Sequence, residues 1–507
     1  MTPAPHLARG LGWVLVSILC WVPLFPLAKR ALPIVDAFAL GSIRYAIGGA
    51  LFVGLLVAFE GRQALRYEGR FVQAFVLGII GITGFNVLVW YGLTFTRPEH
   101  AAIIMGIQTP LIALGVWLTR GSRHESDESS GMAHFVEHML FKGTATRTAE
   151  EIAQTVDSIG GQLDAFTAKE YASYYVKVLD EHLPLAVDLL SDIVLRPAFH
   201  EGDIEREKKV ILEEIKMVED TPDDLVHEIF TQAFWQGHPL GRPILGTRET
   251  VEGITQSRLR DHFRGAYAAE NVIISAAGNL EHAQLREALD AAFGSMPASG
   301  VRESSDPPHV VPKIVIRNKE LEQSHVCLGA PSYPQNHGDR YASYVMNTML
   351  GGSMSSRLFQ NIREKRGLAY SVFSGINAYR DAGYLTVYAG CANGAVEEVI
   401  DLIVEEMKTI KQTPVSDEEL RRAKDHLKGS VMLSLENTSS RMSHLARQEI
   451  YFDRQFSLDE TLQGIERVSP FDVQRVAGEL FSNGSLAATV LGQVNGLELQ
   501  RDRLNLN

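Results

Sequence analysis

The chain has 507 residues, 45% of them hydrophobic, and a formal net charge of −13 at pH 7, and this length excludes a single ordinary domain. Up to Arg123 there are ten Lys or Arg residues against four Asp or Glu residues, so this part carries +6 and the remainder −19. The acidic remainder argues against nucleic acid as a partner, and the wide spacing of Cys20, Cys327 and Cys391 argues against a disulfide framework or a thiolate metal cluster.

Residues 1–120 are predicted to form a multi-pass membrane segment with four transmembrane helices. Four apolar stretches each approach the roughly 20 residues that span a bilayer. They are residues 11–28, 37–59, 71–93 and 101–118. Basic residues gather on one side of these stretches, so this side is predicted to face the cytoplasm. An even number of spans then places the rest of the chain on the cytoplasmic side as well.

Two runs within this segment carry a resemblance to a known family. The runs WVPLFPLAKRALPIVDAFALGSIRYAIGGALF and FNVLVWYGLTFTRPEHAAIIMGIQTPLIAL resemble the first part of a drug/metabolite transporter of the EamA type, over about residues 1–118. Such transporters contain two helical repeats, and less than one is found in this chain. The resemblance therefore does not imply a complete transport pathway.

Beyond residue 120 the pattern changes to apolar strands alternating with amphipathic helices. A stretch rich in Gly, Pro and Ser before residue 313 predicts a linker. We therefore expect a first lobe at 121–296, a linker at 297–312 and a second lobe at 313–507.

The two lobes are predicted to be duplicates of one another. Each contains a strand, a helix, a Pro turn and a long helix with an acidic start, in the same order. Superposing Ile204 on Leu420 places Ala423 opposite Glu207 and Ser430 opposite Glu214. Since the second lobe lacks these carboxylates, we expect the chemistry in the first lobe.

The pentapeptide HFVEH predicts a metal site. His134 and His138 are four residues apart, about one helical turn, so both imidazoles can face one ion. Glu137 lies close enough to act on a water in an open position of the metal without being a ligand. This H-x-x-E-H order is the inverse of the commoner zinc motif.

A third ligand is required, because a catalytic zinc takes three protein ligands and keeps a position for water. In the helix DIEREKKVILEEIKMVED, Glu214 falls beside the apolar stripe, and Glu207 shares its direction two turns earlier. Glu213 points away and is expected in solvent. The residues alone also allow His134 and His138 to be ordinary histidines and the two glutamates to be ordinary helix charges.

HFVEH, the distant VILEEI and the longer runs GMAHFVEHMLFKGT and LGGSMSSRLFQNIREKRGLAYSV together resemble the insulinase or pitrilysin family of metallopeptidases. The match is closer to the processing-peptidase branch and covers about residues 112–507. The resemblance implies one Zn²⁺ per chain held by His134, His138 and Glu214, with Glu137 as general base and Glu207 supporting the site.

The same resemblance extends to the second lobe, where Arg363 and Tyr370 match positions that hold and polarise the substrate. Their alternative roles are a helix-surface arginine and a packed tyrosine. The implied fold is α+β, with two homologous α/β lobes of the processing-peptidase type, each a mainly antiparallel sheet with helices. The family forms a two-lobed chamber, commonly completed by pairing of two chains, so a homodimer or a related peptidase subunit is an expected partner.

The function predicted from the sequence is a membrane-tethered zinc endopeptidase that hydrolyses short or unfolded polypeptides with water that the metal activates. The segment GQLDAFTAKEYASYY is expected to be a sheet strand, either with no ligand or with an edge that pairs with an extended peptide. Two other functions remain open: a non-catalytic processing-peptidase-like subunit, and a transporter fragment with a passive peptidase-like tail.

Overall fold

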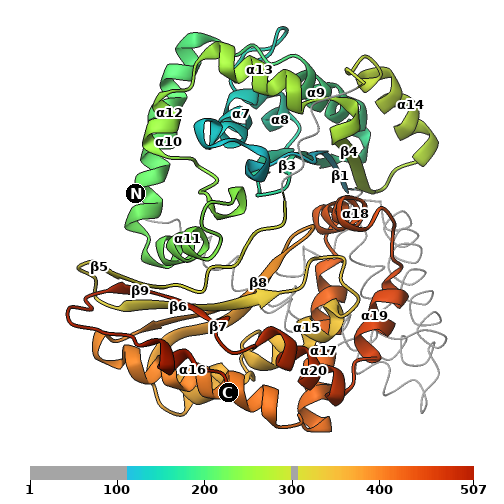
Figure 1. The fold of residues 1–507 in the computed structure, drawn as a ribbon. Helices are drawn as coiled ribbons and strands as arrows, with labels where there is room; N and C mark the ends of the chain where they lie inside the picture. The colour runs from blue at the N-terminus through green and yellow to red at the C-terminus, as the bar shows by residue number, and fades with distance from the viewer. Residues whose placement is uncertain (1–110, 299–305) are drawn as a thin grey trace, which may run out of the picture. The chain divides into compact units, whose positions relative to one another are not determined.

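A computed structural model of the chain describes residues 111–298 and 306–507. The chain divides into two units, residues 1–110 and 111–507, and the second unit contains two lobes (Figure 1). The first three expected membrane stretches, most of the fourth, and residues 299–305 of the expected linker lie outside the described ranges. Within those ranges no helix combines the length and the apolar character that a bilayer crossing requires.

The first lobe is built on a four-stranded antiparallel sheet with the order β2-β3-β1-β4. Its strands are β1 (Leu111–Leu118), β2 (Gln162–Thr167), β3 (Ala172–Leu179) and β4 (Val272–Gly278). Its helices are α7 (Met132–Leu140), α8 (Ala149–Ser158), α9 (Leu183–Leu195), α10 (Glu201–Asp220), α11 (Pro222–Phe234), α12 (Arg248–Glu252), α13 (Gln256–Ala266) and α14 (His282–Phe293). Apolar residues of α7, α9 and α10 form one core with the inward side chains of β1 and β3.

Strand β1 corrects the expectation of a fourth transmembrane helix, because residues 111–118 pair with β3 and β4 in the sheet. Both faces of β1 are buried: Leu114 and Val116 pack in the core under the helices, whereas Ala113 and Trp117 pack in a separate cluster with α18 (Thr438–Phe452). A strand covered on both faces is apolar throughout, and such a run cannot be distinguished from a helix by periodicity. The first lobe thus extends upstream of residue 121.

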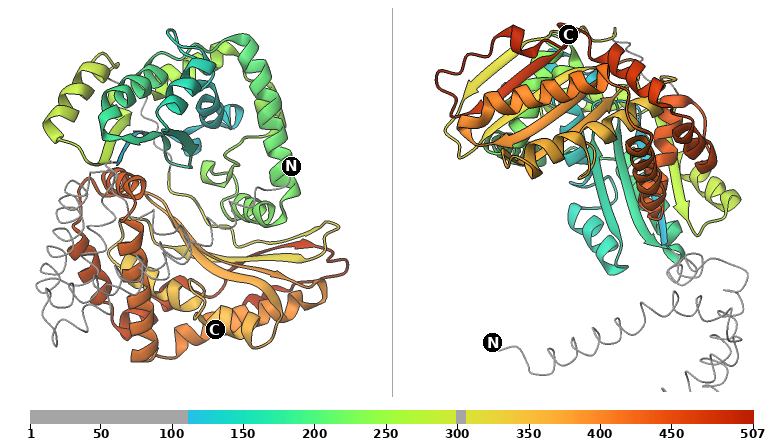
Figure 2. Two further views of the ribbon diagram at one scale, coloured as in Figure 1. Left: turned by 180° about the vertical axis from the view of Figure 1, so that it is seen from behind. Right: turned by 90° about the horizontal axis from the view of Figure 1, so that it is seen from below.

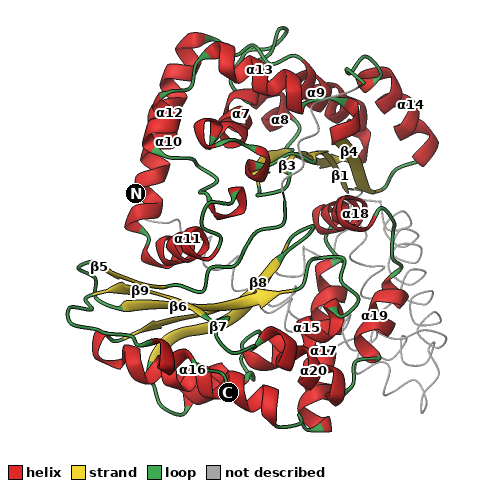
Figure 3. Cartoon of the chain, in the orientation of Figure 1, coloured by secondary structure: helices red, strands yellow, loops and turns green. Residues whose placement is uncertain are grey.

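The second lobe contains a five-stranded mixed sheet with the order β5-β9-β6-β8-β7. Its strands are β5 (Ile314–Asn318), β6 (Ser324–Ser332), β7 (Ala369–Ala378), β8 (Gly383–Cys391) and β9 (Ala487–Gly492). Its helices, besides α18, are α15 (Arg340–Leu350), α16 (Val396–Gln412), α17 (Asp417–Ser434), α19 (Leu458–Glu466) and α20 (Pro470–Leu480). Helices α15, α16 and α20 cover one face of this sheet (Figures 2 and 3).

The two lobes share a strand order, because β7-β8-β6-β9 repeats β2-β3-β1-β4 with the same antiparallel pairings. The second lobe adds β5, which runs parallel to β9. The α+β expectation of two lobes with sheets and helices is therefore confirmed for the described part of the chain.

Several helix starts follow from local sequence. Thr148 accepts a hydrogen bond from the N–H of Glu151, whose side chain returns to Thr148 and forms a capping box at the start of α8. Ser457 and Glu460 form the same arrangement at the start of α19. These side chains satisfy N–H groups that have no partner inside the helix.

In each lobe, one helix packs against the sheet of the other lobe. Helix α11 packs on β6 and β9 of the second lobe, on the face opposite α16, and α18 packs on β1 and β4 of the first lobe (Figure 1). Between these contacts the guanidinium of Arg123 donates to Glu170 of the first lobe at 2.6 Å and to Asp381 of the second at 2.7 Å. Arg123 is 5% exposed and Glu170 7% exposed, so the ion pair is shielded from water and joins the lobes at the turns β2–β3 and β7–β8.

Candidate metal centre

Helix α7 carries the HFVEH motif and is held by its apolar side. Phe135, Val136 and Met139 are fully buried, whereas His134 and His138 are partly exposed on another side of the helix. The ring centroids of the two histidines are 4.7 Å apart. The buried side therefore fixes the direction in which both imidazoles leave the helix.

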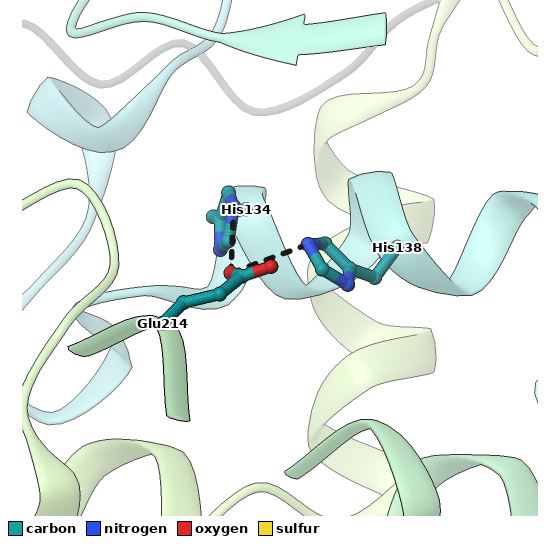
Figure 4. A group of neighbouring side chains, drawn as sticks. All are labelled: His134, His138 and Glu214. Atoms are coloured by element: carbon teal, nitrogen blue, oxygen red, sulfur yellow. Dashed lines mark ion pairs between the residues drawn. The ribbon is translucent and has the colours of Figure 1, made fainter. Parts of the chain in front are cut away.

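Helix α10 packs against α7 and supplies the third donor. Oε2 of Glu214 lies 3.8 Å from Nε2 of His134 and 3.6 Å from Nε2 of His138 (Figure 4). One donor atom from each residue lies within 4.8 Å of the others. Tetrahedral ligands about 2.1 Å from zinc are about 3.4 Å apart, so small side-chain movements suffice for shared coordination.

Burial also keeps His134 in the neutral form that can bind a metal. Desolvation lowers the pKa of His134 to about 3, and the neighbouring His138 contributes in the same direction. The imidazole is therefore neutral at pH 7, and one of its ring nitrogens carries a lone pair that can bind a cation. Two imidazoles and one carboxylate form the donor set typical of a catalytic zinc.

Glu207 lies on the same helix as Glu214 and is 4% exposed. Its Oε2 is 3.0 Å from Nδ1 of His138, and its Oε1 is 2.8 Å from Nζ of Lys142. A carboxylate at Nδ1 favours the tautomer with the proton there, so the unprotonated Nε2, on the side of Glu214, can bind a metal ion. Lys142, one turn beyond His138, balances the buried charge of Glu207.

Glu137 lies beside the donor group and is not part of it. Its Oε2 accepts a hydrogen bond of 2.5 Å from the hydroxyl of Thr167, the last residue of β2. Burial raises the pKa of Glu137, while the Thr167 hydrogen bond and His138 act in the opposite direction. Glu213, which precedes the proposed ligand Glu214 on α10, is exposed and paired with Lys216 at 2.6 Å.

Arg363 and Tyr370 lie together in the second lobe. Arg363 belongs to the π-helical turn η8 (Phe359–Glu364), and its guanidinium lies 5.5 Å from the centre of the Tyr370 ring. Tyr370, on β7, is 77% exposed. Across the described residues no hydrogen bond or ion pair joins either side chain to the three donors.

Three residues that contact the site or helix α7 were not predicted from the sequence: Thr167, Lys142 and Glu125. Glu125 precedes α7, and its carboxylate accepts hydrogen bonds from the N–H groups of Gly131 and Ala133. Burial raises the pKa of Glu125 to about 7, against the lowering effect of these two hydrogen bonds. The available signal was an acidic residue six positions before Gly131, the glycine that directly precedes α7.

Models of known protein families match both parts of the chain. A family model described as insulinase (peptidase family M16) matches residues 103–248, and one described as the peptidase M16 inactive domain matches residues 253–427. A third model, for the EamA-like transporter family, matches residues 8–123. The insulinase and EamA-like matches therefore overlap around the start of β1.

Curated relatives of the chain include zinc proteases whose own roles are uncharacterized. The chain is 42% identical over 379 residues to one from Bacillus subtilis, covering 75% of this chain and 92% of that protein. It is 40% identical over 386 residues to one from Mycobacterium leprae, covering 75% of this chain and 86% of that protein.

Solved structures share the fold. A protease from Helicobacter pylori aligns with a TM-score of 0.69 at 22% identity, covering 76% of this chain and 94% of that one. A peptidase M16 inactive domain from Pseudomonas fluorescens aligns with a TM-score of 0.71 at 21% identity, covering 76% of this chain and 93% of that one.

The expectations of a zinc cofactor and of a protease are confirmed by these relatives together with the His134, His138 and Glu214 group. The identity to zinc proteases extends over nearly their whole length, and the matched residues include both lobes. The chain therefore belongs to peptidase family M16, the insulinase family of zinc proteases.

Proposed function

We propose that the chain is a zinc endopeptidase that hydrolyses short or unfolded polypeptides and is tethered to a membrane by its N-terminal segment. The observation that carries the proposal is the convergence of His134, His138 and Glu214 on one point, with Glu137 beside them. Three protein donors leave a position for water, as a catalytic zinc requires.

In the proposed reaction the zinc, when bound, lowers the pKa of a water and polarises the scissile carbonyl. Glu137 takes a proton from the attacking water as the new C–O bond forms at the carbonyl carbon. It then gives that proton to the amine as the C–N bond breaks. Tyr370 donates a hydrogen bond to the carbonyl oxygen as negative charge develops there, and Arg363 holds the substrate.

Strand β2 is the proposed peptide-binding edge. It pairs with β3 on one side, and no described strand pairs with its other side. An extended peptide can add to such an edge through main-chain hydrogen bonds. Because Thr167 at the end of β2 contacts Glu137, a peptide on this edge would run toward the proposed general base.

A cavity of about 600 Å³ borders β2 and supports this choice. Leu163 and Asp164 of β2, Val156 of α8 and Tyr175 of β3 are among its lining residues. Its walls are both apolar and charged, so it can receive a substrate side chain from the added strand. Main-chain pairing with such a pocket favours extended polypeptides over folded proteins.

The test is cleavage of an unstructured peptide by the full-length protein, with zinc measured on the same sample. We expect about one zinc per chain, cleavage that a chelator abolishes, and loss of cleavage in Glu137→Gln with zinc retained. Glu213→Gln, an exposed carboxylate on α10, is the matched control and should behave as wild type. Zinc binding without any cleavage would instead support a non-catalytic subunit.

The membrane tether and a paired assembly are further parts of the proposal. The tether rests on the EamA-like match over residues 8–123 and on the three apolar stretches before the fourth, residues 11–28, 37–59 and 71–93. Extraction of the protein from membranes by alkaline carbonate would contradict the membrane tether. Light scattering of the detergent-solubilised protein would establish whether two chains pair.

A further inference from the structure

The first turn of α7 is capped by a residue outside the helix. Glu125 lies in the loop between β1 and α7 and is 5% exposed. Its Oε2 accepts a hydrogen bond from the N–H of Gly131 at 2.8 Å, and its Oε1 accepts one from the N–H of Ala133 at 2.6 Å. The first N–H groups of a helix have no partner inside it, and Glu125 satisfies two of them.

The cap has to come from a distance, because the usual capping position is restricted to glycine. Gly131 has φ of +94°, a conformation that disfavours residues with a side chain. A Cβ at this position would also lie 2.6 Å from the carbonyl oxygen of Leu245. Ser, Thr, Asp or Asn therefore cannot occupy the N-cap and supply the acceptor.

The two histidines of α7 differ in what holds their rings. Nδ1 of His138 lies 3.0 Å from Oε2 of Glu207, which fixes the ring through its side chain. Nδ1 of His134 is buried and has no hydrogen-bond partner among the described residues. The orientation of the His134 ring therefore depends more on the position of its own backbone than that of His138 does. This backbone directly follows Ala133, whose N–H is bonded to Glu125.

We propose that Glu125 is a positioning residue of the zinc site, which holds the first turn of α7 so that Nε2 of His134 points at Glu214. The inference rests on the proposed ligand set of His134, His138 and Glu214. Glu125 contacts no donor side chain, and it acts through the N–H groups of Gly131 and Ala133. Arg242 also holds the loop, by donating a hydrogen bond of 2.5 Å to the carbonyl oxygen of Glu125.

The test variant is Glu125→Gln in the full-length protein. The amide keeps the size of the side chain but turns an NH₂ group toward one of the two backbone N–H groups, so one hydrogen bond is lost. We expect the zinc dissociation constant, measured by competition with a chelator, to rise about tenfold, the low end for residues that orient ligands indirectly. Hydrogen exchange of the zinc-free protein should increase in the peptide covering α7.

Two controls separate this role from general stabilisation and from a wrong ligand set. Glu128→Gln changes an exposed carboxylate three residues away and should leave both readouts unchanged. His134→Ala should abolish stoichiometric zinc binding, and retained zinc there would refute the ligand set whatever Glu125 does. A general loss of stability would lower the melting temperature of Glu125→Gln while the zinc affinity of the folded protein stayed at the wild-type value.

Wild-type zinc affinity in folded Glu125→Gln would overturn the proposal. If that variant does not fold, Glu125→Asp carries the test, because it keeps the carboxylate but is shorter by one methylene. We then expect a smaller weakening of zinc binding and faster exchange in α7. Wild-type values for both measurements would count against the positioning role.

Discussion

The hydroxyl of Thr167 donates a hydrogen bond of 2.5 Å to Oε2 of Glu137. This contact joins the last residue of β2 to α7, the helix that carries two of the three proposed ligands. The strand proposed to pair with a peptide and the carboxylate proposed to activate water are thereby linked through one side chain. A shift of β2 would therefore change the position of the Glu137 carboxylate directly.

We predict that Thr167→Val lowers kcat about tenfold with little change in zinc content, because Glu137 loses the group that orients it. The Thr167 hydrogen bond lowers the pKa of Glu137, so its removal raises that pKa. The acidic limb of the rate profile, where the base becomes protonated, should then move to higher pH. Thr167→Ser keeps a hydroxyl and should restore most of the rate, and an unshifted acidic limb in Thr167→Val would contradict the assignment.

Glu207 offers a test of the contacts behind His138. Glu207→Gln replaces the carboxylate at Nδ1 of His138 by an amide and leaves Lys142 without its counter-charge. Partners that orient a metal-ligating histidine typically change metal affinity by about 10- to 100-fold, so we expect the zinc dissociation constant to rise by that factor. Chelator competition measures it, and Glu205→Gln, an exposed carboxylate on the same helix, serves as the control.

Part of this site could be predicted from sequence because it depends on short-range periodicity. Four residues separate His134 from His138, and helical geometry alone brings their imidazoles to one side. Glu214 was predicted from its place beside an apolar stripe together with the resemblance to the insulinase family. Glu125 could not be identified in this way, since its role depends on a loop that turns back to the start of α7.

Two features of the fold also exceeded what the sequence could predict. The run at β1 has the apolar composition of a membrane helix, and only pairing with β3 and β4 reveals a strand buried on both faces. The contact between Arg123 and Asp381 joins residues 258 positions apart. No local pattern indicates such a pair, because it forms only when the two lobes meet.

Asp192, on α9, provides a prediction about stability and pH. Burial raises the pKa of Asp192, but hydrogen bonds from Thr144, Arg196, Thr146 and Arg147 outweigh it and bring the pKa to about 2. This value is below the roughly 3.9 of an unfolded chain. The folded state therefore gains stability from Asp192 above about pH 4 and loses it as the pH falls toward 2.

The variant Asp192→Asn should lower the free energy of unfolding by about 2 kcal/mol at pH 7, because an amide cannot accept all of these hydrogen bonds. The difference from wild type should narrow between pH 4 and 2, as followed by thermal melts across that range. Asp188→Asn is the matched control: Asp188 also pairs with Arg147 but is 54% exposed, so its loss should matter much less. A pH-independent difference for Asp192→Asn would rule out the ionised carboxylate as the cause.

Tyr370 gives the clearest separation of catalysis from stability, because its side chain is 77% exposed and contributes little to the core. Tyr370→Phe keeps the ring that lies 5.5 Å from the guanidinium of Arg363 and removes only the hydroxyl. If this hydroxyl stabilises the developing oxyanion, kcat should fall about 100-fold, as for other oxyanion donors. KM, zinc content and melting temperature should remain near wild type, since the hydroxyl is proposed to bind the transition state more strongly than the substrate. Unchanged kcat would return Tyr370 to the role of an exposed surface residue on β7, and a loss confined to KM would assign it to substrate binding alone.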